Sequence, residues 1–113
     1  MARVPEIDVG QLRQRQTAEP PPFLLDVREP WEYQAGHVPG ARLIPLGELE
    51  DRVNEVPRDR TILVICHSGQ RSLAAAGFLL QLGYASVSNV DGGTAAWIER
   101  GYPVERESPA EAG

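Results

Sequence analysis

The sequence has one cysteine and no lysine, because all 11 of its basic residues are arginines. A single cysteine cannot form an internal disulfide, so cysteine usage does not indicate an oxidising compartment. The absence of lysine excludes a Schiff-base lysine and a phosphate-binding lysine. The N-terminus has no apolar stretch typical of a signal peptide, and no run approaches the roughly 18 apolar residues of a membrane helix. We therefore expect a cytoplasmic protein with no membrane partner.

Positive charge is also scarce. The formal net charge is -5 and there is no run of basic residues, which disfavours a nucleic acid or an acidic membrane surface as the main partner. With 113 residues, of which 42% are hydrophobic, the chain is long enough for one core and too short for two. We predict one domain over residues 1–104 and a flexible C-terminal tail over the polar residues 105–113.

Short apolar runs alternate with helical patterns along the chain. Strands are predicted at residues 23–27, 41–44, 62–65 and 86–90, and helices at residues 9–15, 29–35, 46–56, 71–82 and 94–100. Asp8 is a suitable N-cap for the first helix. Two apolar stripes on the helix at 71–82 predict burial over much of its circumference. The alternation predicts an α/β fold, with a central parallel sheet and helices on its faces.

The single cysteine lies where the strongest predicted strand ends and the strongest predicted helix is about to begin. Ligands of parallel sheets bind beyond the carboxyl ends of the strands. The segment CHSGQR, residues 66–71, therefore combines a thiol with a glycine-containing turn, a helix N-terminus and an arginine. Helix N-termini and nearby cations favour the thiolate, which is the nucleophilic form. A buried cysteine is often only a small core residue, but this polar turn favours a functional Cys66.

Three segments carry a resemblance to a known family: residues 26–41 (DVREPWEYQAGHVPGA), 66–72 (CHSGQRS) and 90–104 (VDGGTAAWIERGYPV). In this order and spacing they resemble the single-domain rhodanese-like (thiosulfate sulfurtransferase) family. The resemblance implies a compact α/β domain with helices on both faces of a parallel sheet. It also implies that Cys66 accepts a sulfane sulfur from a donor such as thiosulfate, becomes a persulfide, and passes the sulfur to a thiophilic acceptor.

The resemblance also assigns roles within the loop. Cys66 is the nucleophile, and the predicted substrate-binding residues are His67, Ser68, Gly69, Gln70 and Arg71. Arg71 would help to bind an anionic donor, and Ser72 is predicted to cap the following helix or to bond to the thiolate. His67 stands where family members frequently have arginine, so donor binding is expected to depend on pH. The implied partners are a small anionic donor and a thiol or sulfur-carrier protein as acceptor. No cofactor is implied, since the persulfide carries the chemistry.

Other polar residues receive structural interpretations. Asp26 and Arg28 match the family's D-x-R element and are expected to support the site as an ion pair. Glu32 and Tyr33 are expected to bond or pack locally. His37 is expected to order its turn. No metal site is predicted, because the two histidines and the cysteine lack ligand spacing.

The glycine pair at 92–93 is expected to form a family turn rather than a phosphate site, because no G-x-G-x-x-G and no P-loop lysine accompany it. Trp31 and Trp97 are expected in the core or in a cleft wall.

Three rival functions remain open from the sequence. A cysteine phosphatase of this fold would have five residues between its cysteine and arginine, but only four separate Cys66 from Arg71. A non-catalytic module for regulation or sulfur-carrier binding is disfavoured by the cysteine itself, and we expect no second domain for it to regulate. A redox carrier would need a resolving thiol from a partner.

Overall fold

The computed structural model describes residues 3–107. Its elements follow the chain in the order β1 (Glu6–Ile7), α1 (Val9–Arg15), β2 (Phe23–Asp26), α2 (Pro30–Ala35), β3 (Arg42–Leu43), η1 (Leu46–Glu48), α3 (Leu49–Arg52), η2 (Val53–Glu55), β4 (Ile62–Ile65), α4 (Gln70–Gln81), β5 (Val87–Val90) and α5 (Gly93–Glu99). None of the helices in this part of the chain combines the length and the hydropathy needed to cross a membrane.

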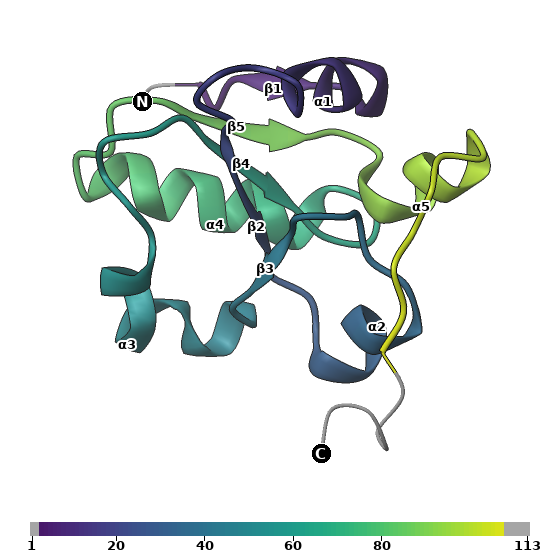
Figure 1. Ribbon diagram of the computed structural model, residues 1–113. Helices are drawn as coiled ribbons and strands as arrows, with labels where there is room; N and C mark the ends of the chain where they lie inside the picture. Colours follow the sequence, from purple (N-terminus) through teal and green to yellow (C-terminus); the bar gives the residue numbers. More distant parts are fainter. Residues whose placement is uncertain (1–2, 108–113) are drawn as a thin grey trace.

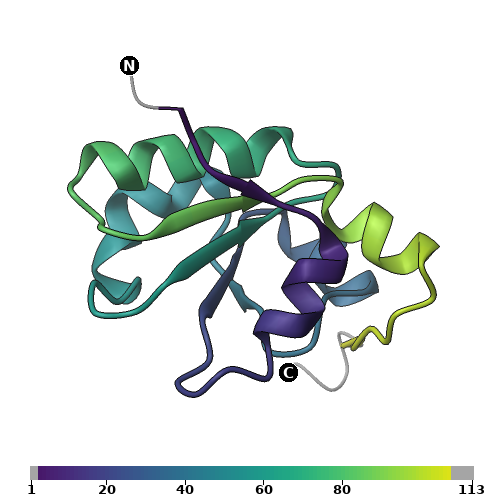
Figure 2. The same cartoon turned by 90° about the horizontal axis from the view of Figure 1, so that it is seen from above.

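The five strands form one parallel sheet in the order β1-β5-β4-β2-β3. Parallel neighbours need crossover connections, and these place helices on both faces of the sheet (Figures 1 and 2). The predicted α/β class, with helices on both faces, is thus confirmed. The central strands β2 and β4 run side by side and end together, with Asp26 opposite Ile65. The segments that follow these two strands therefore lie next to each other at the carboxyl edge.

Alternating side chains of the central strands supply two cores. Ile62 and Val64 of β4 pack on the α3 and α4 side, with Ala75 and Leu79. Leu63 and Ile65 point to the opposite face, among residues of α1 and α5 that include Leu12 and Trp97. All four β4 residues are buried, as expected for a strand covered on both faces.

Several elements match the predicted bounds closely. The helix Val9–Arg15 has Asp8 as its N-cap, and its side chain accepts a hydrogen bond from the Gln11 backbone. The strand Ile62–Ile65 is as predicted. Both signals are local: a cap followed by a turn, and an uninterrupted apolar run.

Other predicted elements need correction. The segment 46–56 is not one helix but a 3₁₀ turn, one α-turn and a second 3₁₀ turn. Its sequence contains Gly47 and Asn54, which favour helices weakly, and only Leu49 among these helical residues is buried. Strand β1 was not predicted, because two residues are too few to show a period. Its register is set by the backbone N–H of Asn89 and of Asp91, each of which donates to a carbonyl of the β1 segment.

Helix α4 is also less covered than its two apolar stripes predict. Ala75, Ala76 and Leu79 are buried, but Leu73 and Leu82 are 42% and 40% exposed. Within the described residues, the sheet covers only one side of this helix.

The first residues of the predicted tail, from residue 105, bond to the turn after α2, and the flexibility of the tail stays a prediction. Residues Glu105 and His37 exchange two backbone hydrogen bonds, and the Glu107 backbone donates to Gln34. Residues 108–113 of the predicted tail lie outside the described part of the chain.

Candidate active site

The thiol of Cys66 lies at the carboxyl end of β4, inside the turn that leads to α4. The backbone N–H of Gly69 donates a hydrogen bond to Sγ at 3.1 Å, and the hydroxyl of Ser72 donates a second at 3.3 Å. Ser72 is fully buried and Cys66 is 1% exposed, so the hydroxyl has few other partners. Gly69 has a φ of 108°, which an L-residue with a side chain adopts only under strain. The glycine thus lets the chain turn its N–H back towards the sulfur.

These donors set the ionisation of the thiol. Burial is the largest single influence on the pKa of Cys66 and opposes ionisation. Hydrogen bonds from the hydroxyl and the N–H of Ser72, and from further N–H groups of the loop, together outweigh burial. The pKa of the Cys66 thiol is therefore lowered from its usual range, and the thiolate fraction at neutral pH is raised.

The start of α5 forms the support beneath this loop. The backbone N–H groups of Thr94 and Ala95 donate to the carbonyls of Cys66 and His67 at 2.8 and 2.9 Å. Gly93 permits this approach, because a Cβ there would meet the two carbonyl oxygens at 2.6 and 2.5 Å. The glycine pair therefore allows α5 to pack closely against the loop. The N–H groups of Thr94 and Ala95 at the start of α5 already donate to loop carbonyls.

Asn89 is a supporting residue that was not predicted. It is fully buried on β5, and its side-chain amide donates to the Gly69 carbonyl at 3.1 Å and to Glu6 at 2.9 Å. A polar residue in a buried strand, one position before the strand's last residue, was the only signal in the sequence. Asn89 fixes the glycine of the loop from below.

Asp26 and Arg28 form a buried ion pair beside the loop, with a shortest distance of 2.8 Å. Arg28 also donates to the carbonyl of Gly36 at 2.9 Å. The pair thus ties the end of β2 to the turn after α2. The expected ion pair is thus present, and the supporting role of the two residues stays a prediction.

Arg71 lies at the rim of the loop, on the first turn of α4. Its guanidinium donates two hydrogen bonds to the carboxylate of Glu32, at 2.8 and 2.9 Å. Glu32 also bonds locally, through the Glu29 backbone N–H, but its contact across 39 residues was not predicted. Hydrogen bonding to Arg71 lowers the pKa of Glu32 to about 2 despite partial burial. The donor-binding role of Arg71 stays a prediction, because a carboxylate already holds its guanidinium.

The remaining loop residues face outward. His67, Ser68 and Gln70 are exposed. His67 borders a shallow depression of about 220 Å³ that is also lined by residues of α2 and α5: Trp31, Glu32, Ala35, Thr94 and Ile98. Trp31 is 72% exposed, so it belongs to the wall of this depression and not to the core. Trp97 is buried, as expected, and donates to the Pro103 carbonyl.

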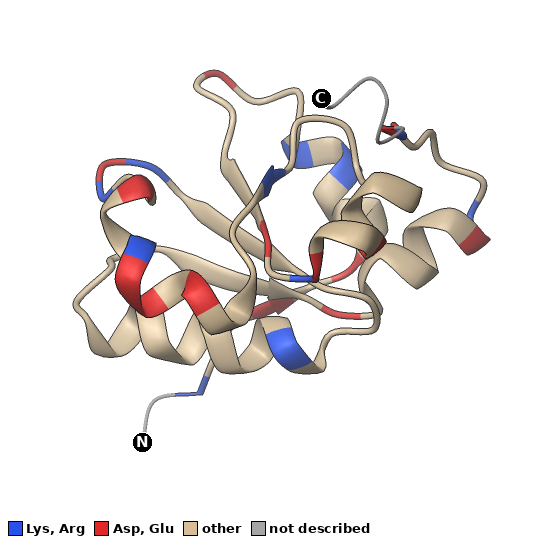
Figure 3. Cartoon of the chain, turned by 90° about the horizontal axis from the view of Figure 1, so that it is seen from below, with Lys and Arg blue, Asp and Glu red and all other residues tan. Residues whose placement is uncertain are grey.

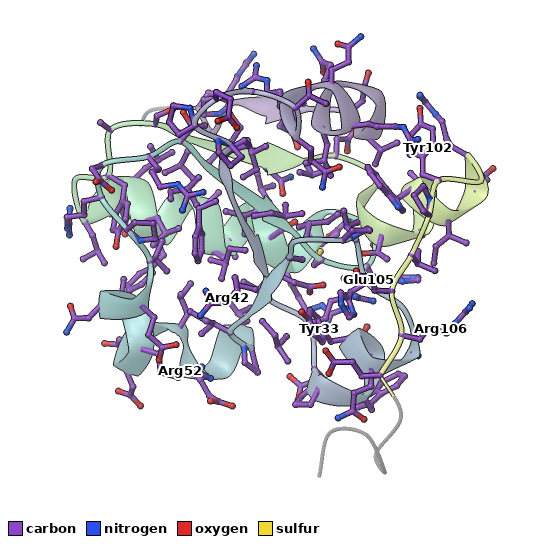
Figure 4. All side chains as sticks on the ribbon, in the orientation of Figure 1. Tyr33, Arg42, Arg52, Tyr102, Glu105 and Arg106 are labelled. Carbon is purple, nitrogen blue, oxygen red and sulfur yellow. The ribbon has the colours of Figure 1, made fainter. Side chains whose placement is uncertain are left out.

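His37 orders its turn rather than facing the loop. Its ring stacks on Tyr33 with a centroid distance of 3.7 Å, and its Nδ1 donates to the Tyr33 carbonyl at 2.7 Å. Figure 4 shows Tyr33 close to Glu105 of the C-terminal segment, whose carboxylate lies 3.7 Å from the other ring nitrogen of His37. Among residues 3–107, no three histidine, cysteine, aspartate or glutamate side chains are grouped as a metal site requires.

Comparison with known proteins places this chain in a family. Residues 8–100 match the rhodanese-like domain. A sulfurtransferase of Allochromatium vinosum is 39% identical over 101 residues, which cover 89% of this chain and 94% of that protein. A protein of Bacillus subtilis described as a proposed sulfur carrier is 42% identical over 94 residues, although these span only 51% of its length. The crystal structure of a rhodanese-related protein from Thermoplasma volcanium superposes with a TM-score of 0.83, at 40% identity, covering 91% of this chain and 99% of that one.

The chain belongs to the rhodanese-like family. Its relatives support a role in sulfur transfer, which requires a sulfur donor and a sulfur acceptor as partners.

Proposed function

We propose that the protein is a sulfurtransferase that carries a sulfane sulfur as a persulfide of Cys66. The observation that carries this proposal is the hydrogen bonding of Sγ by the Gly69 N–H and the Ser72 hydroxyl. Both donors stabilise a thiolate before transfer, and donors that are already oriented towards developing charge cost no reorganisation during a reaction.

In the first step, the Cys66 thiolate attacks the outer sulfur of a donor such as thiosulfate. A bond forms between Sγ and that sulfur, the bond to the rest of the donor breaks, and its electron pair leaves with sulfite. In the second step, a thiolate acceptor attacks the outer sulfur of the persulfide. The Cys66 thiolate is then the leaving group and is regenerated. Neither step needs a cofactor, because the sulfur moves without net oxidation.

The loop residues have complementary roles in this scheme. The N–H groups of residues 67–71 bind the outer sulfur, and an anionic donor reaches the Arg71 guanidinium only by displacing Glu32. Asp26, Arg28 and Ser72 hold the loop and the thiol in place. A thiol or a sulfur-carrier protein is the proposed acceptor. A cytoplasmic location suits this chemistry, because reducing compartments keep a free thiol available.

Intact-mass measurement tests the proposal. Wild type and Cys66→Ser are incubated separately with thiosulfate and with a small persulfide, and then with cyanide. We expect wild type to gain one sulfur atom that cyanide removes, and the variant to gain none. Absence of the gain in wild type with both donors, or an equal gain in the variant, would reject the proposal.

A further inference from the structure

The cation at the rim of the Cys66 loop is held within the protein. Both terminal nitrogens of Arg71 bond to Glu32, one to each carboxylate oxygen. Bidentate pairs between arginine and a carboxylate are among the stronger polar contacts in proteins. Since the pKa of Glu32 is lowered to about 2, its carboxylate is ionised at neutral pH. An anionic donor must therefore compete with Glu32 for the guanidinium.

The second arginine near the loop is held in the same way. Arg28 is buried and bonds to Asp26 and to the Gly36 carbonyl. Asp91 lies on the other side, with its Cα 3.7 Å from the position that a Cβ of Gly69 would occupy. The two arginines near this loop are thus each paired with a carboxylate, Arg71 with Glu32 and Arg28 with Asp26. Figure 3 shows acidic and basic positions interspersed along the ribbon.

What the surroundings of the loop offer instead is apolar surface. In the depression next to His67, Trp31 and Ile98 are 72% and 51% exposed, and the charged residues that also line it, Arg28 and Glu32, are both held in ion pairs. Its volume of about 220 Å³ is below the range of roughly 300–1,000 Å³ that holds a drug-sized ligand. A small organic group of low charge matches this wall better than a compact dianion does.

We propose that Glu32 determines the donor class of Cys66 by holding Arg71, and that the preferred donors are small organic persulfides with an uncharged organic group. This inference rests on the proposed function. The Cys66 thiolate attacks the outer sulfur of the persulfide, the new S–S bond forms at Sγ, and the donor's own S–S bond breaks. Its electron pair leaves with the organic thiolate, which remains beside Trp31 and Ile98 until it is released.

Two matched persulfides separate charge from leaving-group chemistry. Hydroxyethyl persulfide and carboxyethyl persulfide differ by one carboxylate, and thiosulfate provides a dianion. The measurement is kcat/KM for each donor with cyanide as acceptor, corrected for the reaction without protein. In wild type we expect kcat/KM for hydroxyethyl persulfide to be about tenfold higher than for carboxyethyl persulfide. This factor corresponds to one unfavourable contact between charges, with a free energy similar in size to that of a hydrogen bond to a charged group.

Variants then identify the residue responsible. In Glu32→Gln, which keeps the shape and removes the charge, the preference for the uncharged persulfide should fall to about twofold or less, and thiosulfate should gain about tenfold in kcat/KM through a lower KM. Glu32→Asp keeps the charge and should keep the preference. Glu50→Gln removes an equal charge from an exposed position in α3 and controls for net charge, so it should also keep the preference.

The outcomes are distinct. A wild-type protein that uses both persulfides equally, or that prefers thiosulfate, overturns the inference, as does a preference that Glu32→Gln leaves intact. In each of those cases Cys66 still becomes loaded with sulfur. If Cys66 is loaded by none of the three donors, the proposed function fails, and the inference fails with it.

Discussion

Two turns of this protein share the same backbone conformation before a helix, but their N–H groups bind different acceptors. The first follows β4 and the second follows β5, and in each a glycine of positive φ precedes the helix, Gly69 before α4 and Gly92 before α5, without a side-chain cap. In the first turn, the Gly69 N–H donates to the Cys66 sulfur. In the second turn, the first helical N–H groups donate to the carbonyls of the first turn. A glycine and a helix N-terminus therefore do not make an anion site by themselves, because the donors must also be left without a backbone partner.

The largest effect is expected where the two turns touch. Gly93→Ala puts a methyl group within 2.6 Å of two backbone oxygens and imposes a φ of 59° on a residue with a side chain. We expect a loss of about 2–5 kcal/mol in the free energy of unfolding, from overpacking and backbone strain together. Urea denaturation followed by the fluorescence of the buried Trp97 measures it.

Two other glycines calibrate this prediction. Gly69→Ala has the unfavourable φ but no contact closer than 3.4 Å, so it should cost less, about 1–2 kcal/mol. Gly47→Ala meets nothing within 4 Å and has no positive φ, so it should cost nothing measurable. If Gly93→Ala is no worse than Gly69→Ala, then the close packing of α5 on the loop does not contribute to stability.

The next effect concerns the donors that distinguish the first turn. Ser72→Ala removes a hydroxyl that donates to Sγ, while burial, which raises the pKa of Cys66, remains. We expect the pKa of the thiol to rise, so that alkylation of Cys66 by iodoacetamide needs a higher pH.

The matched control is Ser86→Ala, an exposed serine before β5 whose hydroxyl bonds to Thr61 instead. Its alkylation profile should match that of wild type. An unchanged profile in Ser72→Ala would mean that the backbone N–H groups alone hold the thiolate.

How well the sequence predicts these turns depends on how far apart in the sequence the contacting residues are. The Cys66 loop lies in one short segment, so its strand, glycine and helix could all be recognised from neighbouring residues. The first helix and its Asp8 cap were equally local. The family resemblance added the fold and the order of the motifs.

The contacts that complete the site are long-range, and no spacing reveals them. Glu32 meets Arg71 across 39 residues, and Asn89 meets Gly69 across 20. The exposure of Trp31 could not be predicted either, because a tryptophan in a short amphipathic turn is compatible with the core and with the wall of a surface depression. The positive charge of Arg71, which was expected to face the donor, is thus paired with Glu32, and only the fold brings these two residues together.

The smallest expected effect concerns the ion pair of Arg71 and Glu32 at the rim of the first turn, a feature that the second turn does not share. Because the pKa of Glu32 is lowered from 4.5 to about 2 by Arg71, the pair adds stability that is complete above about pH 5 and is lost as pH falls towards 2. Arg71 is partly exposed, so we expect Glu32→Gln to cost only about 1 kcal/mol at pH 7.

That cost should shrink as the pH is lowered to about 3, since wild type then loses the same interaction that the variant lacks. Urea denaturation of both proteins at several pH values measures the difference, with Glu50→Gln as the variant whose cost should stay near zero throughout. A cost of Glu32→Gln that is the same at pH 7 and at pH 3 would show that the cost does not come from the charge of the ionised carboxylate, because wild type loses that charge as the pH falls. Arg71 would then be available to an anionic donor, and the rim of the first turn would be as basic as its sequence indicates.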